Sequence, residues 1–210
     1  MDYAPFINKN GWLTEFYLTL STTPRSIPFT INHTAFATGP GRTTTQRLGY
    51  TGNYEIEMPI NCPMQEGTRA VFVRWGDGLA SNTRTMYLSS NQTLSAQYKI
   101  QYLVSINASV GGAVNLGGGW FDEGTTMILN ATPSPGYRLV GFTTVESVSL
   151  LSQNGSSVTV MVNGPGSVTA NFIAIPPDYT CLYIAAAVVA IATVTLALFL
   201  RIKRKGRSSH

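Results

Sequence analysis

Charged side chains are scarce in this chain of 210 residues, where Asp, Glu, Lys and Arg together make up 11% of the sequence. Soluble domains typically carry about 25%. Five of the 14 basic residues lie in the last ten positions, which leaves nine basic against ten acidic residues elsewhere. The remainder is therefore close to neutral. It has no basic patch interleaved with aromatic residues, so it is not expected to bind nucleic acid.

Cysteine and histidine are also rare, with two of each. Cys62 and Cys181 lie far apart in the sequence and in expected environment, so no disulfide is expected between them, and neither has neighbours at metal-ligand spacing. His33 falls in a polar loop and His210 ends the chain, so no histidine is placed to act with a cysteine or a carboxylate. We expect no metal and no cofactor, and we predict that the chain is not an enzyme.

The acidic residues that stand out lie beside glycine. Asp77 is flanked by glycines on both sides, and Asp122 and Glu123 precede Gly124. A calcium site needs six to eight oxygen ligands, and a paired-carboxylate enzyme needs two carboxyl groups that converge in a cleft. Neither pattern is present, whereas Asp next to Gly is typical of turns. These carboxylates are predicted to form turns.

A long apolar run lies near the C-terminus. Residues 181–200 contain no charged residue, and a helix of that length spans about 30 Å, the thickness of the hydrocarbon core of a bilayer. A buried helix of a soluble protein is the alternative, but such helices rarely contain more than about 14 uninterrupted apolar residues. We therefore predict a transmembrane helix over residues 181–200, whose natural partner is a lipid bilayer.

The flanks of this run predict its orientation. The tail, residues 201–210, carries the basic residues Arg201, Lys203, Arg204, Lys205 and Arg207. Basic residues accumulate on the cytoplasmic side, so everything before the span is expected outside the cell. Tyr179 and Tyr183 suit the opposite interface, and residues 176–180, with two prolines, are predicted to form a stiff linker.

The N-terminus shows no export signal. Residues 1–10 lack a basic segment followed by an apolar one. Either the span inserts the chain after translation, or the chain is the C-terminal part of a longer exported protein. We expect the second, because the first residues read as the middle of a domain.

Between residues 12 and 174 the apolar pattern alternates with period two, and no stretch has the 3.6-residue period of an amphipathic helix. The predicted class is all-β, with two small tandem modules of sandwich or β-grasp-like form before the helix. Turn residues at 76–78 and 163–166 border the strands. The predicted strands are residues 16–21, 54–58, 70–75, 85–88, 93–98, 102–107, 125–131, 137–143, 157–162 and 167–172.

Internal repeats define the two modules. Residues 17–21 correspond to residues 102–106, residues 50–58 parallel residues 121–129, and residues 92–98 match residues 166–172. The predicted boundary lies near Ile100 and Gln101. The expected organisation is an N-terminal segment at residues 1–14, module 1 at residues 15–100 with an insertion at residues 24–47, and module 2 at residues 101–175.

Module 2 resembles a divergent internalin-type B repeat. The resemblance rests on Gly112-Ala113-Val114, on Trp120 followed by Gly124, on Ala131-Thr132-Pro133-Ser134-Pro135-Gly136-Tyr137 and on Thr169-Ala170-Asn171-Phe172. The family usually has a tryptophan where this chain has Phe142. Module 1 keeps a tryptophan there, Trp75, and is similar to related repeats of archaeal surface proteins. The resemblance implies a β module of cell-surface and secreted proteins, used as a spacer or adhesive element, with no catalytic residues.

Five sequons for N-glycosylation precede the apolar run. The candidate acceptors are Asn32, Asn91, Asn107, Asn130 and Asn154. Asn91 and Asn154 lie beside predicted turns and are the acceptors most expected to carry sugar. The aromatic residues Trp75, Trp120, Tyr137 and Phe142 resemble a sugar-stacking platform, but at strand positions they are predicted to be core.

Together these observations predict a single-pass cell-surface glycoprotein of archaeal type, whose β modules form an extracellular stalk or adhesive segment. Surface-layer proteins or glycans are its expected partners. Two alternatives stay open. The chain is the anchor end of a larger exported enzyme such as a surface protease, or it is a receptor ectodomain that signals through a membrane partner, because its ten-residue tail is too short to signal alone.

Overall fold

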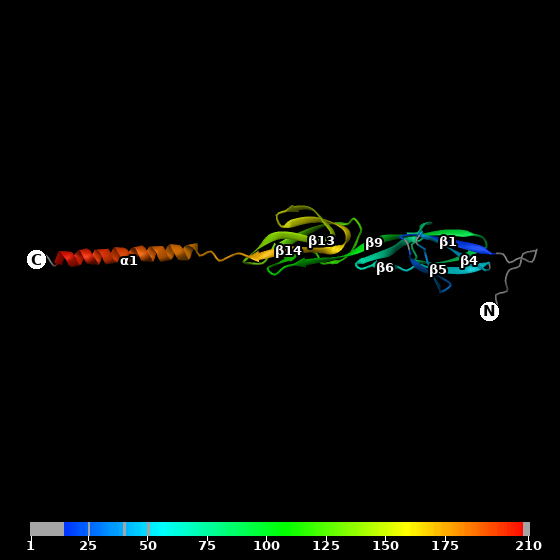
Figure 1. Cartoon of the computed structure of the whole chain (residues 1–210), viewed down its shortest axis with the longest axis horizontal. Coiled ribbons are helices and arrows are strands. Elements are labelled where there is room, and N and C mark those ends of the chain that lie inside the picture. The colour runs from blue at the N-terminus through cyan, green and yellow to red at the C-terminus, as the bar shows by residue number, and fades with distance from the viewer. Residues whose placement is uncertain (1–14, 25, 40, 50, 208–210) are drawn as a thin grey trace, which may run out of the picture.

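A computed structural model describes residues 15–207, apart from residues 25, 40 and 50. The predicted N-terminal segment, residues 1–14, and the last three residues lie outside the described residues. In the described part, strands are followed by a C-terminal helix, which confirms the predicted class (Figure 1). The elements are β1 (Phe16–Thr23), β2 (Pro28–Ile31), β3 (Thr34–Ala37), β4 (Thr43–Leu48), β5 (Gly52–Glu57), β6 (Asn61–Gln65), β7 (Thr68–Trp75), β8 (Thr83–Leu88), β9 (Gln92–Ala108), β10 (Gly112–Val114), β11 (Gly119–Asp122), β12 (Thr126–Pro133), β13 (Tyr137–Asn154), β14 (Ser157–Ala174) and α1 (Thr180–Arg207).

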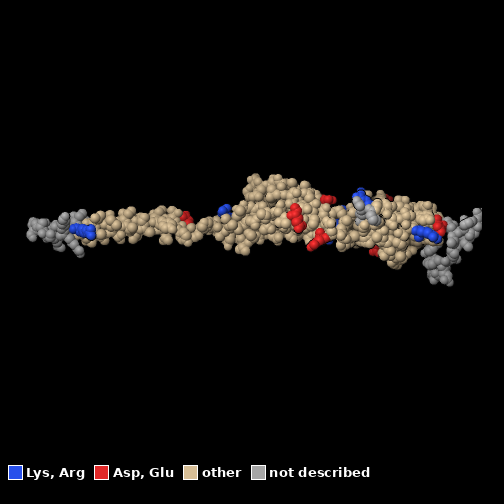
Figure 2. All heavy atoms as spheres, in the orientation of Figure 1, with Lys and Arg blue, Asp and Glu red and all other residues tan. Residues whose placement is uncertain are grey.

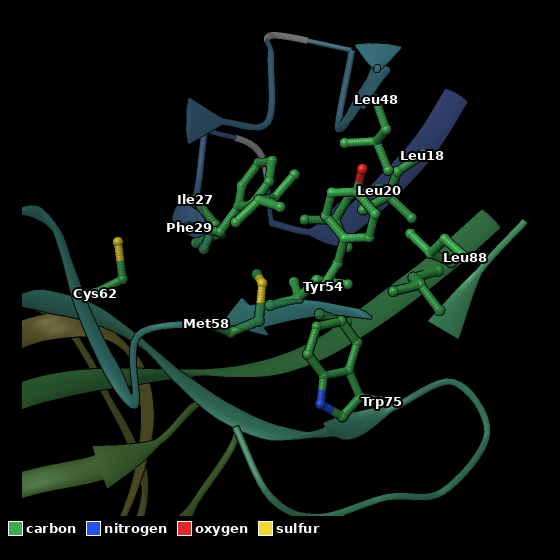
Figure 3. Close-up of a cluster of buried hydrophobic side chains, with 14 of the residues drawn as sticks. Leu18, Leu20, Ile27, Phe29, Leu48, Tyr54, Met58, Cys62, Trp75 and Leu88 are labelled. Carbon is green, nitrogen blue, oxygen red and sulfur yellow. The ribbon is translucent and has the colours of Figure 1, made fainter. Parts of the chain in front are cut away.

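Module 1 takes the sandwich form. One layer contains β1, β4, β6, β7 and the first half of β9, and the other is the four-stranded sheet β3-β2-β5-β8. Alternating residues of both layers point inward. Leu18 and Leu20 from the first layer and Phe29, Tyr54 and Leu88 from the second are all buried in one cluster (Figure 3). The absence of a helix from the described residues of the modules favours the sandwich over a β-grasp form.

The predicted insertion at residues 24–47 is an integral part of this sandwich, which the sequence pattern missed. It supplies β2, β3 and β4, and Phe29 and Ile31 of β2 are 2% and 4% exposed. The buried hydroxyls of Thr22 and Thr38 lie 2.8 Å apart, and Thr38 Oγ1 accepts a hydrogen bond from Ile27 N at 2.9 Å. These bonds satisfy polar groups inside the core, as burial requires.

Module 2 is built around β14. The first half of β14 pairs with β12, the second half pairs in parallel with β9, and β13 runs antiparallel along its whole length. Inward residues of β14 alternate with outward ones, and the core contains Val158, Val160, Val162, Val168, Ala170 and Phe172.

Two predicted interruptions are absent from the strands. Residues 93–98 and 102–107 belong to the single strand β9, of 17 residues, and residues 157–162 and 167–172 belong to β14, of 18 residues. Residues 163–166 therefore do not reverse the chain. Val148 pairs with Val162, and Glu146 pairs with Gly166. Residues 163–165 of β14 therefore lie opposite the single residue Ser147 of β13 and form a bulge. Gly and Pro suit such bulges as well as they suit turns.

Strand pairing shows how the modules correspond. In module 1 the first strand, β1, pairs in parallel with the first half of β9, and Leu20 lies beside Leu94. In module 2 the second half of β9 pairs in parallel with the end of β14, and Ile106 lies beside Val168. Leu18 is therefore equivalent to Val104. The predicted match of residues 17–21 to residues 102–106 is wrong by one position, because a shift of one residue exchanges the faces of a strand.

The end of each module agrees with the predicted correspondence. Trp75 pairs with Ala96 after a bulge at Phe72 and Arg74, and Phe142 pairs with Ala170 after a bulge at Leu139 and Gly141. Trp75 and Phe142 thus occupy the same place in the two modules, and both are buried.

Candidate functional sites: an apolar helix, glycan acceptor sequons and a paired junction

Helix α1 follows a short segment without regular structure, residues 175–179. Asp178 Oδ1 accepts a hydrogen bond from Thr180 N at 2.8 Å, which caps the first turn, and this bonding holds the pKa of Asp178 below its usual value. Pro176 and Pro177 precede the cap, as predicted. The helix begins at Thr180 and continues to Arg207, past the predicted end at residue 200.

The surface of α1 is suited to lipid. Its segment Thr180–Leu198 has a mean hydropathy of 2.4 and is long and apolar enough to cross a membrane, and none of it is buried against the rest of the chain. Charged side chains lie only near the two ends of the helix (Figure 2). The hydroxyls of Thr193 and Thr195 donate to carbonyl oxygens three residues earlier, at 2.8 and 2.9 Å, so both are satisfied without water.

The predicted topology residues lie in the last two turns of the helix. Arg201 is exposed. The backbone of Lys203, Arg204, Lys205 and Arg207 is helical, and their side chains lie outside the described residues.

All five sequon asparagines are exposed. Asn32 occupies a hairpin turn between β2 and β3 with a φ of 46°, Asn91 lies between β8 and β9, and Asn154 ends β13 at its hairpin. Asn107 and Asn130 lie within strands. The side-chain oxygens of Asn32 and Asn91 accept hydrogen bonds from Glu55 N at 2.8 Å and from Tyr17 N at 3.0 Å, and a glycan would attach at the side-chain nitrogen of each asparagine.

The modules meet through strand pairing and not through a loose linker. On one side of β9, β7 of module 1 is paired along its length, and its first residue, Thr68, lies opposite Tyr102. On the other side of β9, β11 of module 2 is paired from Gly119 to Asp122, and Asp122 lies opposite Gln101. The pairings of the two modules overlap at residues 101–102. The predicted boundary at Ile100 and Gln101 therefore lies inside a three-stranded segment, which we call the junction.

A row of polar side chains crosses the junction. Arg69 Nε and Nη2 donate to Gln101 Oε1 at 2.9 and 2.7 Å, Gln101 Nε2 donates to Asp122 Oδ1 at 2.7 Å, and Lys99 Nζ lies 3.0 Å from Asp122 Oδ2. The Arg69 guanidinium also lies over the Trp120 ring, 4.3 Å from its centroid. The row joins strands of both modules, so it resists bending between them.

Packing at the junction depends on Gly67, in the turn between β6 and β7. Gly67 O accepts a hydrogen bond from Leu103 N at 2.8 Å, and its φ is 66°. A Cβ at this position would lie 2.6 Å from the Cβ of Pro165. The hairpin of module 1 therefore touches the bulge of module 2 directly. The bulge at residues 163–165 thus has a role in the contact between modules.

Changing Gly67 to alanine is expected to loosen the junction. Both Gly67→Ala and Gly155→Ala place alanine at positive φ in a hairpin turn, at a cost of about 1–2 kcal/mol each. Only Gly67 has a neighbour within 4 Å of the added Cβ, because nothing lies that close at Gly155. With spin labels at Tyr87→Cys and Ile128→Cys in a Cys181→Ala chain, the distance distribution should broaden for Gly67→Ala. Equal distributions for the two glycine variants would contradict this prediction.

Acid is expected to weaken the polar row. Hydrogen bonds from Gln101 and Lys99 hold the pKa of Asp122 below its ordinary value of about 3.9. The stabilisation is therefore present above about pH 4 and is lost as the pH falls through the folded-state pKa. Because the Asp122 side chain is 47% exposed, the contribution is about 0.2–1 kcal/mol. Asp122→Asn should lower the unfolding free energy at neutral pH and match the parent chain near pH 2; a constant difference at all pH values would contradict this.

The remaining candidate residues lie in a turn, in the core or on the surface. Asp77 lies in the predicted turn, where Leu79 N donates to it and Arg84 forms an ion pair at 2.9 Å, which lowers its pKa. Trp75 and Phe142 are core residues and Tyr137 packs against the core, whereas Trp120 is 37% exposed beneath Arg69 and is not a core residue.

The two cysteines, Cys62 and Cys181, are free, and burial raises the pKa of Cys62. In the described residues, no three His, Cys, Asp or Glu side chains are grouped to hold a metal.

The structure thus defines tandem β modules followed by a helix that can cross a membrane. Residues 102–176 match the family model of the divergent InlB B-repeat domain, which confirms the resemblance seen in module 2. The match covers that module and the start of the linker. Comparisons with curated proteins and with solved structures gave no match. A B-repeat module followed by an apolar helix fits a membrane-anchored surface protein.

Proposed function

We propose that the chain is a single-pass cell-surface protein whose two modules form a stiff extracellular stalk. The observation that carries this proposal is the shared strand β9, which pairs with strands of both modules on its two sides. A hinge between modules needs a few residues free of pairing, whereas residues 101–102 are paired on both sides, with β7 and with β11. A stalk of this kind holds whatever lies beyond module 1 at a fixed distance from the bilayer.

Several finer features belong to the proposal. The basic tail lies in the cytoplasm and the modules lie outside, on the strength of the residues from Arg201 onward. The exposed sequons carry glycans, which suits a surface poor in charge. The resemblance of module 1 supports an archaeal cell surface, where neighbouring surface-layer proteins or glycans are the partners. The match of module 2 to a B-repeat domain supports a structural or adhesive role for the stalk.

Protease protection in intact cells tests the proposed topology. With an epitope fused after His210, external protease should remove both modules and leave a fragment of the helix and tail that keeps the epitope. Permeabilised cells supply the control, in which the epitope should also be lost. Survival of the modules in intact cells, together with their digestion after permeabilisation, would overturn the orientation.

A further inference from the structure

The end of module 2 next to α1 is a rim made of three segments. They are residues 109–111 after β9, residues 134–136 before β13, and residues 173–175 at the end of β14. Ser134 N donates to Gly111 O at 2.8 Å, Ile175 N donates to Gly136 O at 2.7 Å, and Phe172 N donates to Ser109 Oγ at 2.8 Å. Each segment is thus hydrogen-bonded to another part of module 2. We call this surface the helix-proximal rim.

Close packing fixes the shape of the rim. Gly111 has a φ of 103°, and a Cβ there would lie 2.1 Å from the Tyr137 ring. A Cβ on the next residue, Gly112, would lie 2.3 Å from the Phe172 ring. Only glycine allows the chain to pass this close to both rings. The preceding residue, Val110, is therefore held on a tight turn and not on a free loop.

The rim presents apolar side chains to its surroundings. Val110 is 83% exposed, the largest value for any large apolar residue in the described chain, and Ile173 and Ile175 are 43% and 52% exposed. Residues 105–114, 131–141 and 168–177 contain a single charged residue, Arg138. Arg138 is exposed and pairs with Ile173. An exposed valine at a fixed tip, with one cation nearby, suits the interface of a bilayer, where apolar groups meet phosphates.

The rim is also in reach of a bilayer crossed by α1. Residues 175–179 separate β14 from the helix, and a fully extended chain of that length spans at most about 18 Å. The headgroup layer takes up about 5–8 Å of this on one side of the bilayer. Figure 1 shows α1 leading away from this end of module 2, so a membrane around the helix faces the rim.

We propose that the helix-proximal rim docks on the bilayer, with Val110 and Ile175 at headgroup level and Arg138 near the lipid phosphates. The proposal rests on the membrane anchoring proposed above. Docking at a second point beside the helix would hold the stalk upright.

Quenching by lipid in nanodiscs tests the docking. The full chain with Cys181→Ala is labelled with a polarity-sensitive fluorophore at Val110→Cys, in phosphatidylcholine that carries a nitroxide on part of its headgroups. Cys62 is buried and should not react. Tyr183→Cys reports the helix, and Tyr87→Cys, 66% exposed in module 1, is the distant control. We expect the labels at positions 110 and 183 to be quenched at least threefold more than the label at position 87.

Two results would overturn the docking in different ways. Quenching at position 183 with none at position 110 above the control would mean that the module stands clear of the bilayer. Absence of quenching at position 183 would overturn the anchoring itself and the docking with it.

A second pair of variants separates docking from mere proximity. The fluorophore is placed on the rim at Ser134→Cys, because the hydrogen bond from residue 134 to Gly111 comes from the backbone and survives the change. In this labelled chain, Val110→Asp should reduce the quenching by half or more. Ile128→Asp places the same charge at a residue of β12 that is 59% exposed and away from the rim, and it should change nothing. Equal quenching in the two aspartate variants would contradict an apolar contact at Val110.

Discussion

Replacing Trp75 with alanine is expected to lower the unfolding free energy of module 1 by about 3–5 kcal/mol. Trp75 is fully buried, its Nε1 donates to Ser81 O at 2.8 Å, and its ring meets Phe72 edge-on with centroids 5.9 Å apart. The Arg84 guanidinium lies 5.1 Å from the same ring, and Figure 3 shows Trp75 in the core below Tyr54 and Leu88. The substitution leaves a cavity, a carbonyl without its donor and a cation without its aromatic partner.

Denaturant unfolding of the full chain in nanodiscs, followed by far-ultraviolet circular dichroism, measures this loss. Trp120→Ala is the matched control, because Trp120 is 37% exposed and its main partner is Arg69. Its loss should cost about 1 kcal/mol. Trp75→Phe should cost less than Trp75→Ala, since Phe142 fills the equivalent place in module 2. Equal midpoints for the two alanine variants would contradict the assignment of Trp75 to the core.

The sequence predicted the elements whose side chains alternate strictly. Strands β1, β5 and β12 were expected within a few residues, because inward and outward positions alternate along them. Strands β2, β3 and β4 were missed, since β2 and β3 have only four residues each and β4, with the sequence TTTQRL, has a single apolar residue. Such short runs lack a readable period, and their burial depends on the sheet across the core.

The connections were harder to predict than the strands. Gly and Pro at residues 163–166 are found in tight turns and in bulges alike, and only the pairing of β14 with β13 shows a bulge. The one-residue error in the repeat arose in the same way, because Leu103 and Val104 are both apolar and only their pairing shows which one faces the core.

The junction was outside the reach of sequence reasoning. Arg69 and Gln101 are 32 residues apart, and neither belongs to a motif. Their contact exists because β7 pairs with β9 in a register that places Arg69 opposite Gln101. One signal was present, since the two repeats follow each other without any linker rich in Gly, Pro or Ser near residue 100. The absence of such a linker indicates shared structure between neighbouring modules.

Two arginines in the middle of α1 are expected to release the chain from membranes. The run from Thr180 to Leu200 contains ten Leu, Ile, Val and Phe residues, worth about 3–6 kcal/mol of insertion free energy together. An arginine at the centre costs about 2.5–3.5 kcal/mol. Val189→Arg with Ala192→Arg therefore costs about as much as the whole run provides, and no described part of the chain covers the helix to shelter the charges.

Alkaline carbonate extraction of isolated membranes measures this effect. The parent chain should stay in the membrane pellet, and the double-arginine variant should move to the supernatant. Ser208→Arg with Ser209→Arg adds the same charge beyond the apolar run and should leave the chain in the pellet, which separates the position of the charge from its amount. If the variant with arginines at positions 189 and 192 resists extraction as well as this control does, the helix is not held by lipid, because no bilayer core tolerates two unpaired guanidinium groups at its centre without a measurable cost.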